Sequence, residues 1–328
     1  MNIKNAKELL MKTIPAGLPI LIKGAPGVGK TDVVTQVAKK LKYDLITVIP
    51  AIADPTDAKG FPGKVDGHYE WQLCGDAYRI TKAKKKTIVF IDDLGQAPAV
   101  VQAAFMQWIL LRRIGEHDVP DCVVFVAATN RRQDKAGVTS ILEPVKSRFA
   151  TIIELEPDAD EWIEWAFDHD MPAELIGFIN FRPALLHEGK ATNDIVNHPC
   201  PRTIANAGKL INIGLDDIET LAGAVGEGCA VELVGFISVY NSLPNISAIL
   251  IDPENAIVPD EPAALYAIVS ALVDKITKDN SGRILKYGNR LPDDFSVLLV
   301  RDSVRKEPKI QNTKAFIKWA TLHKNVLL

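Results

Sequence analysis

The feature that most constrains this chain is the segment GAPGVGKT at residues 24–31. It matches the pattern G-x-x-x-x-G-K-[ST], and it stands between an apolar strand candidate and a stretch with helical periodicity. Glycines let backbone N–H groups turn inward around a phosphate, and the helix that follows presents the positive end of its dipole there. Lys30 can reach the β- and γ-phosphate oxygens, and the Thr31 hydroxyl can ligate Mg²⁺. The residues predicted to bind nucleotide phosphates are Gly24, Ala25, Pro26, Gly27, Val28, Gly29, Lys30 and Thr31.

A second apolar strand candidate ends in two carboxylates, in the segment KKKTIVFIDDLGQAP at residues 84–98. Asp92 stands at the carboxyl end of this strand, where it is suited to hold Mg²⁺ beside Thr31. Asp93 is placed to orient and deprotonate an attacking water molecule. Taken alone, such a strand end is as readily a solvated turn. The preceding phosphate-binding motif is what favours a metal-binding and catalytic role.

The first half of the chain alternates short β-branched segments with amphipathic helical ones, a pattern typical of an α/β fold with a parallel sheet. The predicted strands cover residues 18–23, 44–49, 87–91, 122–127 and 151–155. The predicted helices between them cover residues 31–41, 76–83, 100–111 and 139–147. The sheet is therefore expected to be flanked by helices.

After residue 156 the strand signals fade and helical patterns dominate. The predicted helices cover residues 159–168, 173–180, 201–213, 218–240 with a break at 226–228, 262–278 and 293–304. We therefore expect two domains, an α/β nucleotide-binding domain over residues 1–156 and a helical lid with a C-terminal helical region over residues 157–328.

Composition narrows the possible partners. The chain has 38 basic and 41 acidic residues and a net charge of −3, so no strong overall field favours nucleic acid or an anionic membrane. No apolar run reaches the roughly 18 residues of a membrane span, and the N-terminus lacks the apolar core of a signal peptide. The four cysteines are widely spaced, which fits a reducing compartment. The expected location is the cytoplasm, with no membrane partner.

Three further landmarks follow in chain order. VVFVAATN ends in Asn130, EPVKSRF contains Arg148, and CPRT contains Arg202. An amide at a strand end can hydrogen-bond both the attacking water and the γ-phosphate, and guanidinium forks match phosphate oxygens. The order of these three residues after the phosphate-binding loop and the Asp92-Asp93 pair resembles the order found in AAA+ ATPases. The resemblance implies that they are the sensor-1 residue, the arginine finger and the sensor-2 arginine.

The chain looks most similar to the MoxR-type, AAA_5 branch of that class, whose small stand-alone members occur in bacteria and phages. The segments that carry the likeness are DPTDAKGFPG, FIDDLGQAP, DEWIEWA, FINFRPALLHEG and PRT. The resemblance implies a P-loop NTPase (AAA+) fold with ATP and Mg²⁺ as cofactors. It also implies a homo-oligomeric ring, expected to be a hexamer, in which ATP lies between the α/β domain and the helical lid and Arg148 completes the neighbouring site. The implied work is chaperone-like remodelling of a protein client, such as a von Willebrand A-type or metal-dependent partner.

The chain departs from this branch directly after its acidic strand. Many members carry Glu at the position of Asp93, and most continue with Asn-Arg where this chain has Gly95-Gln96. The carboxylate of Asp93 is therefore one methylene shorter than the usual one.

Residues 60–71, GFPGKVDGHYEW, predict a β-hairpin around Asp66-Gly67. MoxR-type proteins insert a hairpin at this place, facing the pore of the ring. The aromatic residues Phe61, Tyr69 and Trp71 either grip a polypeptide there or fold onto one another, and the sequence leaves both possibilities open.

Two other functions are compatible with the same ATPase core. One is a nucleic-acid motor or loader, which needs a basic groove. The chain clusters its basic residues only at Lys82 with 84–86 and at Arg131-Arg132, and we interpret the first cluster as a solvated helix end. The other is a slow, non-catalytic nucleotide switch, which would follow if Asp93 is too short to act as a base.

Overall fold

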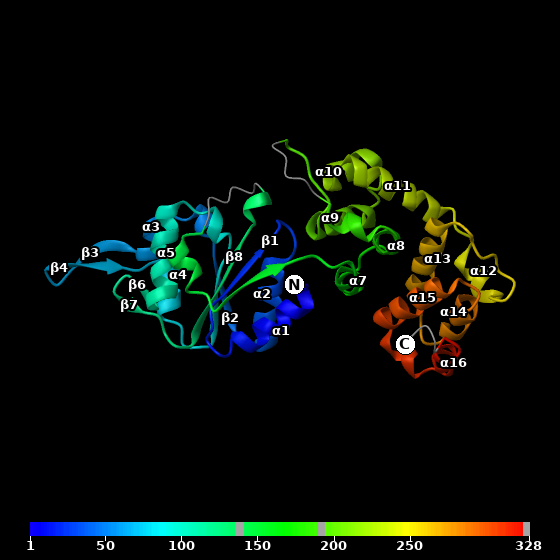
Figure 1. Cartoon of the computed structure of the whole chain (residues 1–328), viewed down its shortest axis with the longest axis horizontal. Coiled ribbons are helices and arrows are strands. Elements are labelled where there is room, and N and C mark those ends of the chain that lie inside the picture. The colour runs from blue at the N-terminus through cyan, green and yellow to red at the C-terminus, as the bar shows by residue number, and fades with distance from the viewer. Residues whose placement is uncertain (135–140, 189–193, 324–328) are drawn as a thin grey trace. The chain divides into compact units, whose positions relative to one another are not determined.

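The computed structural model describes residues 1–134, 141–188 and 194–323. The described chain divides into two compact units, one built on Met1–Pro157 and the other on the helices that follow (Figure 1).

The first unit contains a five-stranded parallel sheet with the strand order β2-β5-β8-β1-β9. Its strands are β1 (Ile20–Gly24), β2 (Asp44–Val48), β5 (Thr87–Ile91), β8 (Val123–Thr129) and β9 (Thr151–Leu155). β1 lies between β8 and β9, with Ile20 opposite Val126 on one side and Thr151 on the other. The predicted parallel α/β sheet is confirmed.

Helices cover both faces of this sheet. Side chains alternate along a strand, so Ile88 and Phe90 of β5 pack with one group of helices while Val89 and Ile91 pack with another. The first group is α1 (Ile3–Thr13) and α2 (Lys30–Leu41), and the second is α4 (Gly75–Thr81) and α5 (Ala99–Leu111). All parallel strands end at the same edge, and the loops that carry the predicted site follow those ends.

The smaller elements of the first unit form the turns and two hairpins around the sheet. They are η1 (Pro50–Ile52), α3 (Pro55–Lys59), β3 (Phe61–Val65), β4 (His68–Gln72), η2 (Leu94–Gln96), β6 (Arg113–Ile114), β7 (His117–Asp118), η3 (Arg132–Asp134) and α6 (Glu143–Lys146). The helix predicted for residues 139–147 begins at Glu143, and its first two residues lie outside the described residues.

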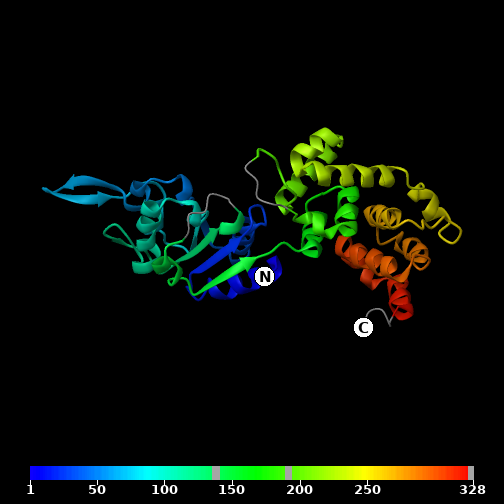
Figure 2. The ribbon, with the colours of Figure 1, turned by 45° about the horizontal axis from the view of Figure 1, so that its top comes forward.

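The predicted hairpin is present as an antiparallel pair of β3 and β4 that extends as an arm from the first unit (Figure 2). Its turn residues, Asp66 and Gly67, have φ angles of 46° and 91°, the left-handed conformation that a tight hairpin turn requires. The base of the arm is anchored through α3, where the indole N–H of the buried Trp108 donates a hydrogen bond of 2.8 Å to the carbonyl of Ala58.

The second unit is helical throughout its described residues. Its elements are α7 (Ala159–Phe167), α8 (Ala173–Phe181), η4 (Pro183–Leu186), α9 (Pro201–Asn212), α10 (Ile218–Val225), α11 (Glu227–Asn241), α12 (Ile246–Ile251), α13 (Pro262–Asp274), α14 (Ser281–Gly288), α15 (Asp293–Lys306), η5 (Pro308–Asn312) and α16 (Lys314–Leu322). The predicted break in the long helix falls at Gly226, which has a φ of 83°. Within the described residues, none of the helices has both the length and the hydropathy to traverse a bilayer.

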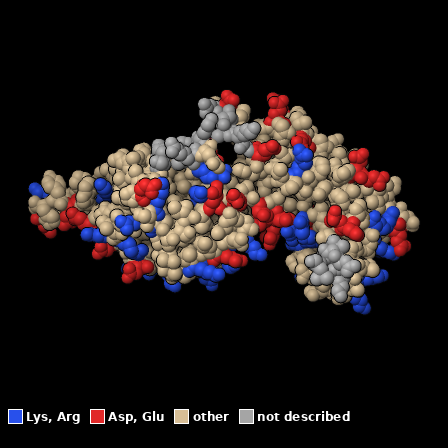
Figure 3. Space-filling view, viewed as in Figure 1, with Lys and Arg blue, Asp and Glu red and all other residues tan. Residues whose placement is uncertain are grey.

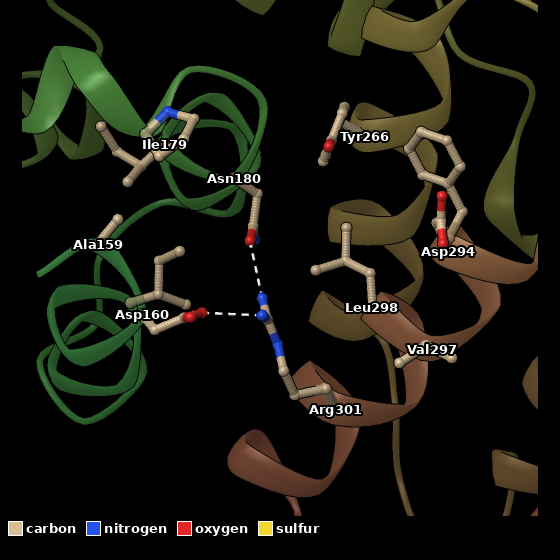
Figure 4. A pocket seen from close by; sticks show the side chains of 12 residues that line it. Ala159, Asp160, Ile179, Asn180, Tyr266, Asp294, Val297, Leu298 and Arg301 are labelled. Atoms are coloured by element: carbon tan, nitrogen blue, oxygen red, sulfur yellow. Dashed lines mark hydrogen bonds and ion pairs between the residues drawn. The ribbon is translucent and has the colours of Figure 1, made fainter. Parts of the chain in front are cut away.

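A cavity of about 370 Å³ lies inside the second unit, lined by residues of α7, α8, α13 and α15. Ile163, Ile179 and Leu298 contribute apolar walls. On one side Arg301 closes a polar network, with ion-pair and hydrogen-bond distances of 2.8 Å to Asp160 and 3.0 Å to the carbonyl oxygen of the Asn180 side chain (Figure 4).

The network extends behind the cavity to Asp302, whose side chain is 3% exposed. Its carboxylate accepts hydrogen bonds from Asn180 at 3.0 Å, from Arg301 at 3.0 Å and from Arg305 at 3.2 Å. Asp160 and Asp302 thus face two guanidinium groups, which balances the charge of the buried carboxylate. We conclude that these contacts attach α15 to α7 and α8.

Asp302→Ala should destabilise the second unit, because it removes the acceptor shared by Asn180 and two arginines. The expected loss in the free energy of unfolding is about 3–5 kcal/mol, nearer the lower figure since Arg301 is partly exposed. Urea denaturation followed by circular dichroism measures it. Asp294→Ala, an exposed change on the same helix, is the control, and an equal effect of both substitutions would contradict this assignment.

Candidate active site

The phosphate-binding loop joins β1 to α2, and its glycines occupy positions that other residues would strain. Gly27 and Gly29 have φ angles of 77° and 96°, a region open to glycine without a steric penalty. At Gly24 the limit is space, since a Cβ would lie 2.8 Å from the carbonyl oxygen of Leu155. The first N–H groups of α2 have no partner within the helix and favour an anion. The loop therefore has the backbone that phosphate groups require.

Lys30 opens α2 and is 7% exposed. Its ammonium group donates hydrogen bonds of 2.9 Å to the carbonyls of Gly24 and Ala25, and one of 2.6 Å to the side-chain oxygen of Asn130. These three acceptors are neutral, and a charged phosphate oxygen forms a stronger hydrogen bond with an ammonium group than a neutral acceptor does.

Thr31 and Asp92 meet directly, with the threonine hydroxyl donating a hydrogen bond of 2.8 Å to the carboxylate. Burial raises the pKa of Asp92 above its ordinary value, and the nearby charge of Asp93 acts in the same direction, whereas the Thr31 hydrogen bond opposes the shift. A cation at this point would stabilise the ionised carboxylate. Hydroxyl and carboxylate oxygens are ligands that suit Mg²⁺, which keeps most of its remaining shell for water and phosphate.

No three His, Cys, Asp or Glu side chains converge on a common point anywhere in the described ranges. Thr31 and Asp92 supply one hydroxyl and one carboxylate at the same point, and these two residues fit Mg²⁺ bound together with ATP. Bound there, the metal would neutralise charge on the phosphates.

Asp93 follows β5 in a left-handed conformation, with a φ of 53°. One of its carboxylate oxygens accepts hydrogen bonds from the side-chain amides of Gln96 at 2.7 Å and Asn130 at 3.4 Å. Asn130 thus bridges Lys30 and Asp93, because its oxygen accepts from one while its nitrogen donates to the other. Gln96 was not among the predicted site residues. The only signal in the sequence was that Gly95-Gln96 stands where similar proteins carry Asn-Arg.

The two predicted arginines stand on other segments of the chain. Arg148 follows α6, whose neighbours Val145 and Phe149 are buried in the core of the first unit, but its own side chain is exposed. Arg202 belongs to the second unit, where it is exposed in the first turn of α9. The structure brings together Lys30 and Asn130 with three other predicted residues, Thr31, Asp92 and Asp93, whereas the roles of the two arginines remain predictions.

The hairpin arm separates its aromatic residues onto two faces. The register sets Tyr69 opposite Lys64 and Trp71 opposite Pro62, so these four residues share a face, while Phe61 lies on the other face opposite Gln72. Tyr69 is 73% exposed and Phe61 is 52% exposed. Because Tyr69 is so exposed, it is not folded onto the other aromatic side chains of the hairpin.

The lysine cluster at residues 82–86 makes local contacts. Lys82 lies 5.9 Å from the ring centre of Tyr78, and Lys86 lies 5.5 Å from that of Tyr43. Figure 3 shows basic and acidic side chains interspersed over the visible face of the first unit. These features agree with the interpretation of this cluster as a solvated end of the domain.

Residues 19–149 match the family model of the AAA domain, dynein-related subfamily. No curated protein matches the chain. Among solved structures, the chain is similar to the RuvB Holliday junction branch migration motor of Thermotoga maritima, with 16% identity over 75% of this chain and 76% of that one and a TM-score of 0.44. It is also similar to NtrX of Brucella abortus in complex with ATP, with 13% identity over 99% of this chain and 66% of that one and a TM-score of 0.45.

The matched segment contains the phosphate-binding loop, the acidic strand and Asn130. With the parallel sheet, it defines the first unit as a P-loop NTPase fold of the AAA+ class. Within that class, the matched model is that of the dynein-related subfamily. The MoxR branch is a narrower group, and membership in it remains a prediction.

Lys30→Ala should weaken the binding of Mg²⁺-ATP about 10- to 100-fold, the loss expected for a charge-assisted hydrogen bond to a phosphate. Isothermal titration calorimetry measures this affinity. Lys40→Ala, an exposed change on the same helix, should bind as the unchanged protein does. Equal affinity of the two variants would show that the loop does not hold the phosphates.

Proposed function

We propose that this protein is an Mg²⁺-dependent ATPase that works as a homo-oligomeric ring, expected to be a hexamer, and remodels a protein client. The observation that carries the proposal is the hydrogen-bonded set at the carboxyl edge of the sheet, in which Lys30, Asn130 and Asp93 are linked and Thr31 contacts Asp92. This set supports the proposal because it brings an ammonium group, a hydroxyl and two carboxylates together in one site.

Each residue has a distinct chemical role in this proposal. Lys30 binds the β- and γ-phosphates, and Thr31 and Asp92 hold the metal. Asp93 accepts a proton from the attacking water, and Asn130 orients that water against the γ-phosphate. Arg202 senses the γ-phosphate from the helical lid.

Arg148 is proposed to act on the nucleotide of the neighbouring subunit. It is an exposed guanidinium on a turn that buried neighbours anchor, and the described residues offer it no hydrogen-bonding partner in its own chain. An exposed arginine on a fixed support is suited to reach a phosphate group on another molecule.

The proposed client is a protein, with von Willebrand A-type or metal-dependent proteins as the candidates that the family resemblance suggests. The support within the chain is the hairpin arm, whose exposed Tyr69 stands beside Lys64 and Trp71 on one face. Aromatic side chains supply a large contact area at a small entropic cost. The cytoplasm is the proposed place of this work.

The shared active site predicts complementation between two inactive variants. Arg148→Ala should bind ATP but hydrolyse it about 10³–10⁵-fold more slowly, the usual contribution of an arginine finger. Lys30→Ala binds nucleotide poorly, and it is assayed at ATP concentrations below its weakened affinity, but it keeps Arg148. Mixing the two should restore part of the phosphate release, and the specific activity of the unchanged protein should rise with its concentration. Wild-type turnover by Arg148→Ala at every concentration would show that each subunit is self-contained.

The hairpin arm predicts that Tyr69→Ala uncouples ATP hydrolysis from the client. Basal hydrolysis and the melting temperature should stay unchanged, because Tyr69 is exposed and lies outside the site. Stimulation of hydrolysis by fluorescently labelled unfolded casein, used as a model client, should fall. Phe61→Ala changes the other face of the same arm and tests whether that face also contributes. Full stimulation of both variants would exclude the arm as the client contact.

A further inference from the structure

Gln96 is attached to Asp93 twice. Its backbone N–H donates a hydrogen bond of 3.0 Å to the carbonyl of Asp93, and its side-chain amide donates one of 2.7 Å to the carboxylate. The first bond closes the turn that the left-handed backbone of Asp93 begins. The second fixes the direction of the carboxylate, so the sequence neighbour three positions on determines where Asp93 points.

The carbonyl oxygen of the same side chain is buried and has no hydrogen-bonding partner among the described residues. A buried acceptor without a partner is unfavourable, because it has lost its hydrogen bonds to water. Exchanging the oxygen and nitrogen of the amide would not relieve this cost, because it would place an oxygen against the carboxylate of Asp93. The orphaned oxygen is therefore a consequence of holding Asp93, and it lies beside the candidate base.

One of the two carboxylate oxygens of Asp93 is left to take part in hydrolysis. Both amide donors, from Gln96 and Asn130, bind Oδ1, whereas Oδ2 makes no hydrogen bond within the described part of the chain. Oδ2 is therefore left to accept a proton from a water molecule, and the hydrogen bond from Gln96 to Oδ1 fixes its direction.

We propose that Gln96 is a positioning residue for hydrolysis, one that fixes the direction of the Asp93 carboxylate through its backbone N–H and its side-chain amide nitrogen. This inference rests on the proposed ATPase function.

The step balances with water as the only co-reactant. The water oxygen forms a bond to the γ-phosphorus, and the bond between that phosphorus and the β–γ bridging oxygen breaks with its electron pair leaving on ADP. One water proton passes to Oδ2 of Asp93 and then to solvent. The second proton stays on the phosphate product.

The first test is Gln96→Met, which keeps the length of the side chain and removes its amide nitrogen and oxygen. Phosphate release at saturating Mg²⁺-ATP should fall about 10- to 100-fold, while the affinity for a non-hydrolysable ATP analogue stays unchanged. Gln107→Met is the matched control, because Gln107 is a half-buried glutamine that donates to a backbone carbonyl, that of Gly115, away from the site. Its turnover should equal that of the unchanged protein.

The second test exchanges the lengths of the two side chains. Gln96→Asn alone should lose turnover, because its amide no longer reaches Asp93. The double change Gln96→Asn with Asp93→Glu restores the combined length, so it should recover at least tenfold over Gln96→Asn. A purely structural role of Gln96 in the turn gives no reason for such a recovery.

The outcomes separate the inference from the proposed function. If the unchanged protein releases no phosphate, the ATPase proposal fails and the role of Gln96 fails with it. If the unchanged protein is active and Gln96→Met is equally fast, only the role of Gln96 is overturned. It is also overturned if turnover and analogue affinity fall in parallel, or if the double change gives no recovery.

Discussion

The hydrogen bond between Lys30 and Asn130 is the contact on which the rest of the candidate site depends. It joins the ends of β1 and β8, which are neighbours in the sheet with Lys23 opposite Thr129. The side-chain nitrogen of Asn130 also donates a hydrogen bond to Asp93 at the end of β5. Residues at the ends of three adjacent strands therefore form one hydrogen-bonded set. The order of the strands makes this possible, because β5, β8 and β1 are neighbours and parallel strands end at the same edge of the sheet.

The parts of the fold and site that could be predicted are those encoded in contiguous residues. The five strands are short β-branched runs, and the Asp66-Gly67 turn is a local signal for a hairpin. The phosphate-binding loop and the Asp92-Asp93 pair combine chemistry and secondary structure in one motif. That these two motifs meet at the same sheet edge follows from the parallel arrangement, and Thr31 and Asp92 indeed lie within hydrogen-bonding distance.

The parts that escaped prediction depend on weaker or longer-range signals. Helix α1 carries its buried side chains only at Ala6 and Leu10, between exposed polar residues, which is a narrow stripe in a short segment. The contact between Gln96 and Asp93 arises from a left-handed backbone at a non-glycine residue, and no local pattern specifies that conformation. The role proposed for Arg148 involves a second subunit, so the contacts of a single chain offer no test of it.

The hairpin arm also has a consequence for how this protein avoids unwanted association. A two-stranded ribbon has two open edges whose unpaired N–H and C=O groups can capture the backbone of another chain. On one of these edges, β3 carries Pro62, which has no N–H to offer, followed by Gly63 and the charged Lys64. These residues disfavour the addition of a third strand along β3. A polypeptide that binds the β3 side of this arm is therefore held through side chains, and it can be released without breaking a ladder of backbone hydrogen bonds.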